Sequence, residues 1–146
     1  LTGGKLQPVL DSLKVYRDMG IWLEITNLVV PSWSDDLAEI ARMCKWLAGN
    51  GFSNTPVHFS RFHPTHKLEQ LPPTPVDVLN KAARIATEEG LKYVYTGNVP
   101  GGELSETFCP KCNNSLVRRQ GYRISGNVIS GSKCPKCNQK VDGIWS

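Results

Sequence analysis

Two identical Cys-Pro-Lys-Cys tetrapeptides have the residue types and spacing most typical of a chemical site in this chain. They span Cys109–Cys112 and Cys134–Cys137, and 21 residues separate them. A Cys-x-x-Cys turn holds two thiolates at the spacing that one metal ion needs, so two such turns can supply a tetrahedral four-sulfur site. The segment between them is long enough for a short β-excursion that returns the second turn to the first. The sequence therefore predicts a structural metal site with the ligands Cys109, Cys112, Cys134 and Cys137.

The kind of site that these cysteines form depends on the redox compartment. The chain has five cysteines, so two disulfides with one spare thiol are an alternative to metal binding. No secretory signal opens the chain, and metal-bound thiolates in the cytoplasm are therefore the favoured interpretation. Zinc is the expected ion, with a rubredoxin-like iron or an iron–sulfur cluster as alternatives. Asn113 and Asn138 follow the two turns at positions that usually take a positive φ, which asparagine tolerates well.

Positive charge gathers in the C-terminal part of the chain. Residues 109–146 hold seven basic residues and one acidic residue, whereas the whole chain has a formal net charge of +4. Some lysines can neutralise the metal–thiolate centre. Arg118, Arg119, Tyr122 and Arg123 favour an alternative in which the module binds nucleic acid or a protein partner. Nucleic acid is the less favoured partner because the module has few aromatic residues. In the chain as a whole, no apolar run is long enough to span a membrane.

The first 106 residues alternate between helical and strand patterns. Helices are predicted at residues 5–19, 37–48 and 75–89, and strands at residues 21–30, 57–62 and 91–96. This alternation predicts parallel strands joined by crossovers. Three strands cannot close a barrel, and a parallel sheet needs both faces covered. We therefore expect an α/β fold: the C-terminal part of a (β/α) barrel in residues 1–106, followed by a small zinc ribbon in residues 107–146. The lack of an initial Met also favours a fragment.

Ligands of α/β folds gather at the carboxyl ends of the strands. This rule points to residues 27–36, 58–66 and 96–103. Arg61 and His63, near the end of the second strand, suit a ligand with a carboxylate or phosphate group. The alternative is that they are solvated rim residues or ion-pair partners.

His63, His66 and Cys44 each allow a further interpretation. His63 and His66 can be read as metal ligands, but no third ligand stands at a suitable spacing. Cys44 lies on the apolar face of its predicted helix, where we expect a small core residue.

Several segments together resemble pyruvate formate-lyase activating enzymes, members of the radical S-adenosylmethionine (SAM) superfamily. Residues 21–36 are similar to a late-barrel strand and loop of these enzymes, and residues 62–92 to the stretch that follows. The closer likeness is to the radical SAM enzymes of the AmmeMemoRadiSam system. It is carried by Ser60–Pro64, Tyr95–Gly101 and the paired Cys-Pro-x-Cys turns before Gly143-Ile144-Trp145.

The resemblance implies the C-terminal fragment of an enzyme that cleaves SAM reductively with a [4Fe–4S] cluster and forms a 5′-deoxyadenosyl radical. The Cys-x-x-x-Cys-x-x-Cys loop that binds this cluster in the family does not occur in this chain. We therefore expect the chain alone to be inactive. Its expected partners are the missing N-terminal half of the barrel and a protein or small-molecule substrate. Four thiolates close a metal site, so the module is expected to brace the barrel or contact the substrate.

The resemblance also implies positions for cofactor contacts. The histidine with which activating enzymes contact SAM falls on His63, and Arg61 lies beside it in sequence. An arginine on the preceding strand of the activating enzymes falls on Thr26, with Asn27 as the neighbouring polar residue. Thr26, Asn27, Arg61 and His63 are therefore the candidate cofactor-binding residues.

Overall fold

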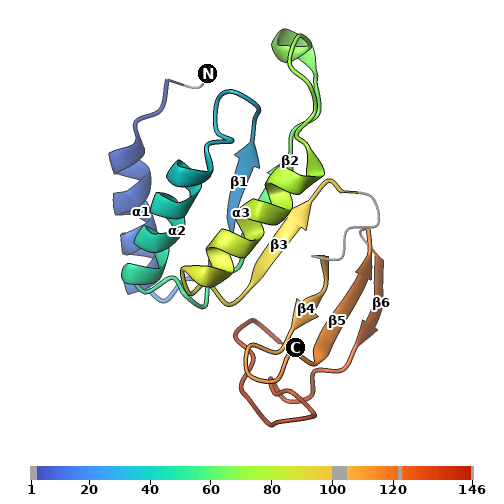
Figure 1. Cartoon of the computed structure of the whole chain (residues 1–146). Coiled ribbons are helices and arrows are strands. Elements are labelled where there is room, and N and C mark those ends of the chain that lie inside the picture. Colours follow the sequence, from blue (N-terminus) through green and yellow to red (C-terminus); the bar gives the residue numbers. More distant parts are fainter. Residues whose placement is uncertain (1–2, 100–104, 122, 146) are drawn as a thin grey trace.

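The chain folds into a three-stranded parallel sheet with helices and a smaller antiparallel sheet after it (Figure 1). The computed structural model describes residues 3–99, 105–121 and 123–145. In chain order the elements are α1 (Leu6–Asp18), β1 (Ile25–Val29), α2 (Leu37–Gly49), β2 (Val57–Arg61), the 3-10 helix η1 (His66–Leu68), α3 (Val76–Glu88), β3 (Val94–Gly97), β4 (Thr107–Phe108), β5 (Ser115–Gln120) and β6 (Arg123–Asn127). The three helices and three strands predicted for the first part are confirmed, and the fold is mixed α/β.

The parallel sheet has the strand order β1-β2-β3. Ile25 is the register partner of Val57, and Val57 is that of Val94, so the predicted parallel pairing is confirmed. Strand β1 is shorter than predicted because the paired stretch of β2 begins only at Val57. Strand β3 also begins later than predicted, because Leu91 first closes the end of α3 by donating its N–H to the carbonyl of Ala86 at 3.0 Å.

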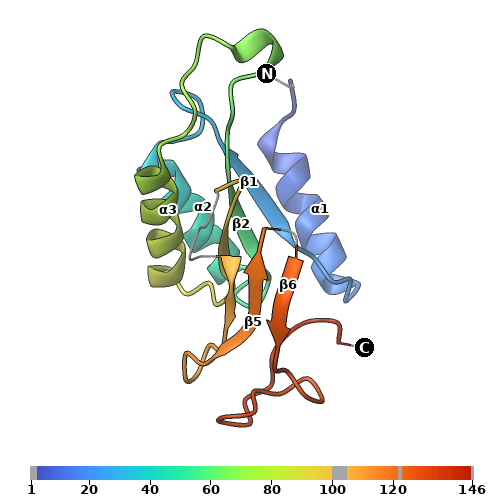
Figure 2. The ribbon, with the colours of Figure 1, turned by 90° about the vertical axis from the view of Figure 1, so that its right-hand side faces the viewer.

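Helices α2 and α3 cover one face of this sheet, and their apolar side chains form the main core with it (Figure 2). The buried helical residues are Ile40, Cys44, Leu47, Leu79, Ala82, Ala83 and Ala86. They pack against Val29, Val57 and Phe59 of the strands. Cys44 is fully buried, which confirms its predicted place in the core. Its pKa is raised to about 11, first by burial and then by the charge of Glu89.

The helix ends follow local sequence rules. Asp36 caps α2 by accepting a hydrogen bond from the N–H of Ala38 at 2.8 Å. Gly51 and Gly90 follow α2 and α3 with φ of 83° and 97°, a conformation that glycine adopts without strain. Asp36 therefore caps the start of α2, and a glycine in the left-handed conformation follows each of the two crossover helices.

A buried threonine joins the carboxyl ends of β1 and β2. Thr74 donates its hydroxyl to the carbonyl of Val29 at 2.5 Å and accepts from the N–H of Phe62 at 2.8 Å. The N–H of Thr74 donates in turn to the carbonyl of Phe62 at 3.2 Å. The side chain is fully buried, and its hydroxyl both donates and accepts a hydrogen bond there. They fix the strand ends from which His63 projects.

Other apolar surfaces stay exposed in the described part of the chain. None of the described residues of α1 is buried, and Leu6 and Val9 are 70% and 55% exposed. On the sheet, Leu28 points away from α2 and α3 and is 48% exposed. We call this side of the parallel sheet the open face. Among the described residues, no helix is long and apolar enough to cross a membrane.

The second sheet has the antiparallel order β4-β5-β6 and contains the β-excursion that was predicted between the two cysteine turns. We call this sheet, together with the two Cys-Pro-Lys-Cys turns, the cysteine module. It packs against β3 and the residue before it through a second core cluster. Its buried members are Tyr93, Cys109, Leu116, Val117, Cys134 and Val141. The module therefore covers the β3 side of the open face.

Candidate metal centre and the adjacent groove

The two cysteine turns have the same backbone conformation. Asn113 and Asn138 have φ of 56° and 60°, as the sequence predicted for the residue after each second cysteine. Each asparagine donates its N–H to the carbonyl of the first cysteine of its turn, Cys109 or Cys134, at 2.9 Å. The identical sequences therefore give two matching turns that present their sulfurs in the same way.

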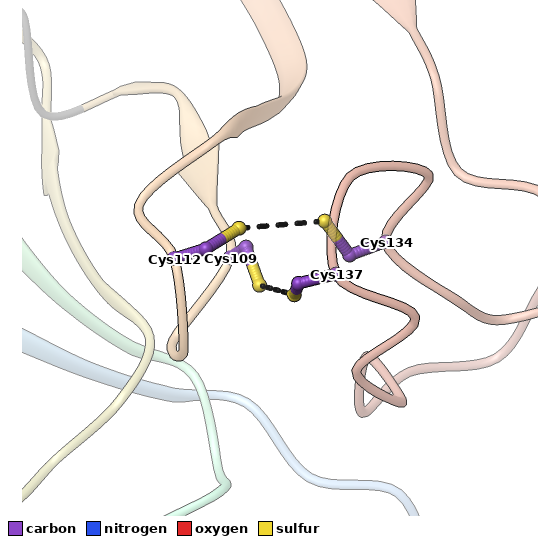
Figure 3. A group of neighbouring side chains, drawn as sticks. All are labelled: Cys109, Cys112, Cys134 and Cys137. Carbon is purple, nitrogen blue, oxygen red and sulfur yellow. Dashed lines mark hydrogen bonds between the residues drawn. The ribbon is translucent and has the colours of Figure 1, made fainter.

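The four sulfurs of Cys109, Cys112, Cys134 and Cys137 gather at one point, and all lie within 4.8 Å of one another. Figure 3 shows two contacts that cross between the turns, Cys109 to Cys137 at 3.5 Å and Cys112 to Cys134 at 3.7 Å. A disulfide needs about 2.05 Å, so these are unbonded sulfurs. Four sulfurs around one zinc lie about 3.8 Å apart, since each Zn–S bond is ~2.3 Å long. The arrangement fits a metal ion such as zinc.

The protonation of these thiols also fits a cation between them. Burial opposes ionisation of Cys134, but the N–H groups of Cys137 and Lys136 donate to its sulfur, and its pKa is lowered to about 7. The N–H of Gln139 lowers the pKa of Cys137, but burial and the three neighbouring sulfurs raise it to about 12. Without a cation the sulfurs thus compete for negative charge, whereas a divalent ion lets all four ionise.

The donor set leaves no position for a further ligand. One cysteine of each turn, Cys109 and Cys134, is buried, and the other, Cys112 and Cys137, is half-buried. In the described part of the chain these four form the one group of three or more His, Cys, Asp or Glu side chains close enough to hold a metal. Four thiolates complete the usual coordination of zinc, so such a site is structural.

A groove of about 1260 Å³ lies between the open face of the parallel sheet and the cysteine module. The sheet contributes His58 and Tyr95, and the module contributes Thr107 and Arg119. Trp145, whose indole N–H donates to the carbonyl of Val141 at 3.0 Å, also lines it. The groove therefore exists because the module packs beside the sheet rather than across its whole face.

A row of polar side chains crosses the floor of this groove. His58 donates its Nε2–H to Glu24 Oε2 at 3.0 Å. Its ring stacks on that of Tyr95, with centroids 5.0 Å apart and an interplanar angle of 21°. Tyr95 is the register partner of His58 on β3, and burial raises the pKa of its phenol. The phenol shares a hydrogen bond with the hydroxyl of Thr107 at 2.9 Å, which links the sheet to the module.

Arg119 extends this row from the module side. Its Nη1 donates to Thr107 Oγ1 at 3.0 Å and to the carbonyl of Ser105 at 3.1 Å, and its guanidinium lies 5.8 Å from the centre of the Tyr95 ring. Arg118 and Arg123 are exposed on the hairpin instead. The arginines that were grouped in sequence thus serve different surfaces. Tyr122, the aromatic member of that group, lies outside the described residues.

Of the four candidate cofactor-binding residues, His63 lies at the mouth of the groove. Its side chain is exposed, and its Nε2–H donates to the carbonyl of Asn98 at 3.4 Å. Arg61 is half-buried and donates its Nε–H to the carbonyl of Thr74 at 2.8 Å. Asn98 in turn donates its side-chain amide to the carbonyl of Arg61 at 3.3 Å. Both His63 and Arg61 are therefore held at the carboxyl end of β2.

Thr26 and Asn27 lie on opposite faces of β1. Thr26 is exposed on the open face, whereas Asn27 points toward α2 and donates its amide to the sulfur of Met43 at 3.6 Å. The side-chain oxygen of Asn27 is buried without a hydrogen-bond partner among the described residues. Neither residue lines the groove with His63, so their assignment as cofactor contacts stays a prediction. The third predicted ligand segment, residues 96–103, is described only as far as Val99.

Glu24 and Tyr95 were not predicted as site residues. Arg119 was named only in the basic group of the alternative nucleic-acid or protein interface, and His58 only within the ligand segment at residues 58–66. The pairing of β1, β2 and β3 brings Glu24, which precedes β1, close to His58 and Tyr95. The packing of the cysteine module against the sheet then adds Arg119. The one signal in the sequence was alternation, which puts His58 on the face opposite Val57 and Phe59.

Comparison with known proteins gives one informative match. The chain is 46% identical over 114 residues to an uncharacterized protein of Methanocaldococcus jannaschii. The matched stretch covers 78% of this chain and 34% of that protein. The chain thus spans about a third of the length of the curated relative that it matches. No protein-family model matches the chain.

Proposed function

We propose that this chain is the C-terminal part of a cytoplasmic radical SAM enzyme similar to pyruvate formate-lyase activating enzymes and to those of the AmmeMemoRadiSam system. In this proposal residues 1–106 are the last part of a (β/α) barrel and residues 107–146 are a zinc ribbon. The observation that carries the proposal is a parallel sheet whose helices α2 and α3 pack on one face only. Such one-sided cover is typical of an arc of a barrel, whose other face forms the interior.

Two further surfaces support an incomplete barrel. Leu28 on the open face and four apolar side chains of α1 are exposed, although residues of this kind are usually buried in a finished α/β fold. The four are Leu6, Val9, Val15 and Tyr16. β1 is an edge strand, so its outer backbone groups are available to another strand. In the proposed parent, an upstream part of the same polypeptide covers these surfaces.

The cysteine module has a structural role in this proposal. Cys109, Cys112, Cys134 and Cys137 close a zinc site and leave no position for SAM. The [4Fe–4S] cluster, which supplies the electron that cleaves SAM when it is bound, is therefore held by an upstream loop of the parent. His63, exposed at the carboxyl end of β2, is the residue of this chain that we assign to SAM contact.

The proposal is tested by reductive cleavage of SAM. The parent polypeptide, reconstituted anaerobically with iron and sulfide, should form 5′-deoxyadenosine in the presence of dithionite. This chain alone, treated in the same way, should form none and should retain zinc. A parent that forms no 5′-deoxyadenosine would rule out the radical SAM assignment.

A second candidate function is supported by the exposed arginines of the hairpin. Arg118 and Arg123 stand on β5 and β6, and Lys111 is exposed in the first cysteine turn. Such a basic surface can bind the phosphates of a nucleic acid. Salt-dependent retention of the zinc-loaded chain on a DNA or RNA column would favour this function. The absence of retention at low ionic strength would dismiss it.

A further inference from the structure

We propose that the groove between the open face and the cysteine module binds an organic ligand with a single carboxylate and an aromatic ring, and that Arg119 receives the carboxylate. The inference goes beyond the proposed function, because it depends on the geometry of this chain and on no SAM chemistry.

The groove has the size and lining of a ligand site. Its volume of about 1260 Å³ is a little above that of small-molecule pockets, which are about 300–1,000 Å³. Six of its lining side chains carry aromatic rings: Trp22, His58, His63, Tyr93, Tyr95 and Trp145. Polar and charged side chains lie between these rings, and a combination of rings with convergent polar groups can orient a small organic molecule.

Arg119 is the feature that points to an anion. Its Nη1 contacts two neutral oxygens, those of Thr107 and Ser105. Within the described ranges, no carboxylate lies within 4.0 Å of its guanidinium, and its Nε–H and Nη2–H groups donate to no acceptor. The side chain is half-buried beside Tyr95, so solvent screens its charge less than it screens that of an exposed arginine. A planar guanidinium with free donors matches a carboxylate in a two-point contact.

The acidic side chains of the groove limit how much negative charge the ligand can carry. Each of them already accepts a hydrogen bond: Glu24 from His58 at 3.0 Å, Glu106 from Ser115 at 2.8 Å and Asp142 from Tyr93 at 3.3 Å. Their charges remain and repel a polyanion such as a polyphosphate or a nucleic acid strand. The combination therefore favours one carboxylate at Arg119 over several phosphates.

The stacked rings of His58 and Tyr95 beside Arg119 are the reason to expect an aromatic ring in the ligand. His58 and Tyr95 form a parallel pair of rings on the groove floor. Thr107 fixes both the phenol of Tyr95 and the guanidinium, so the rings and the cation keep a constant spacing. A ligand ring can lie against these side chains while its carboxylate reaches the free guanidinium donors. Aromatic contacts of this kind stabilise beyond the area that they bury.

Phenylacetate and phenylacetamide are suitable probes, because they share a ring and a shape and differ in charge. NMR spectra of the zinc-loaded chain, labelled with ¹⁵N at backbone and arginine Nε positions, report on both groups. We expect phenylacetate to shift the Arg119 Nε signal and the signals around Tyr95, and to bind about tenfold more tightly than phenylacetamide.

Arg118 offers a matched control, since it is the neighbouring arginine on the same strand and is exposed. Arg119→Gln should reduce the affinity for phenylacetate to that for phenylacetamide, whereas Arg118→Gln should leave it unchanged. Equal binding of the two probes by the unaltered chain would overturn the proposal, whether or not Arg119→Gln folds. An equal loss in both variants would also overturn it. The measurement involves neither SAM nor a cluster, so its failure is distinguishable from failure of the proposed function.

Discussion

Tyr93 and Asp142 form two hydrogen bonds with each other and so join the parallel sheet to the tail of the cysteine module. The phenol donates to Asp142 Oδ2 at 3.3 Å and accepts from the N–H of Asp142 at 3.1 Å. Tyr93 also packs in the same apolar cluster as Cys109 and Cys134, and burial raises its pKa to about 12. The cysteine cluster therefore packs directly against the end of the parallel sheet beside β3.

Removing the phenol of Tyr93 should weaken this junction. Tyr93→Phe keeps the ring but leaves the N–H and a carboxylate oxygen of Asp142 without their partner. We expect a loss of about 1–3 kcal/mol in the free energy of unfolding, with one zinc still bound per chain. Urea titration of the zinc-loaded protein measures the change. Asp142→Asn, which keeps the backbone bond, should cost less, and equal stability of Tyr93→Phe and the unaltered chain would contradict the role given to this pair.

Zinc removal should unfold the cysteine module selectively. The four sulfurs belong to a cluster with few other buried side chains, whereas the parallel sheet has its own core with α2 and α3. Structural zinc supplies much of the folding free energy of small modules. A strong chelator should therefore abolish amide protection in residues 109–141, and residues 25–97 should stay protected in hydrogen-exchange measurements.

Single cysteine variants provide the matched test of the proposed zinc site. Cys109→Ser should lose zinc and give the exchange pattern of the chelated chain. Cys44→Ala should keep one zinc, because Cys44 lies in the other core. Zinc content measured by elemental analysis would contradict the assignment if Cys44→Ala lost the metal or Cys109→Ser retained it fully.

The hydroxyl of Thr74 should be important for stability at the carboxyl end of the sheet. Thr74→Val keeps the shape of the side chain but leaves the carbonyl of Val29 and the N–H of Phe62 without this buried partner. A cost of about 1–3 kcal/mol per unsatisfied group is typical. Thr87, whose hydroxyl bonds within α3 to the carbonyl of Ala83, is a control site for the same substitution. Thermal unfolding should show a much larger loss for Thr74→Val than for Thr87→Val, and similar losses would contradict the proposed junction.

Alkaline pH should destabilise the chain through Cys44. Burial disfavours the thiolate and raises the pKa of Cys44 from its ordinary value of 9.0 to about 11 in the folded chain. As the pH rises above 9, the unfolded chain releases this proton first, so the free energy of unfolding falls until the pH reaches about 11. Cys44→Ala should show a smaller fall over this range in urea titrations of the zinc-loaded protein. Identical pH profiles would contradict the raised pKa.

The elements of the parallel sheet were predictable because local signals agree with tertiary packing. Asp36, Gly51 and Gly90 are residue types that begin or end helices, and the buried residues of α3 follow a helical spacing. The length of β1 was not predictable, since it depends on where β2 can pair with it. The exposure of α1 was not predictable either, because an apolar stripe indicates a buried face without indicating what covers it.

The candidate site residues also differ in whether the sequence predicts them. The cysteines could be predicted because their spacing along the chain alone fixes how each turn presents its sulfurs. The row of Glu24, His58, Tyr95 and Arg119 depends on strand register and on how the module packs, and neither property is local. Arg118 and Arg119 are adjacent in sequence, yet one is exposed on the hairpin and the other lines the groove.

The central claim, that this chain belongs to a radical SAM enzyme, is tested most directly by 5′-deoxyadenosine formation. The parent polypeptide should be reconstituted anaerobically, reduced with dithionite and supplied with SAM, and His63→Ala in the same polypeptide should be compared with it. We predict 5′-deoxyadenosine from the parent, a higher KM for SAM in His63→Ala, and none from this chain alone. Absence of 5′-deoxyadenosine from the reconstituted parent, or its formation by this chain alone, would contradict the account.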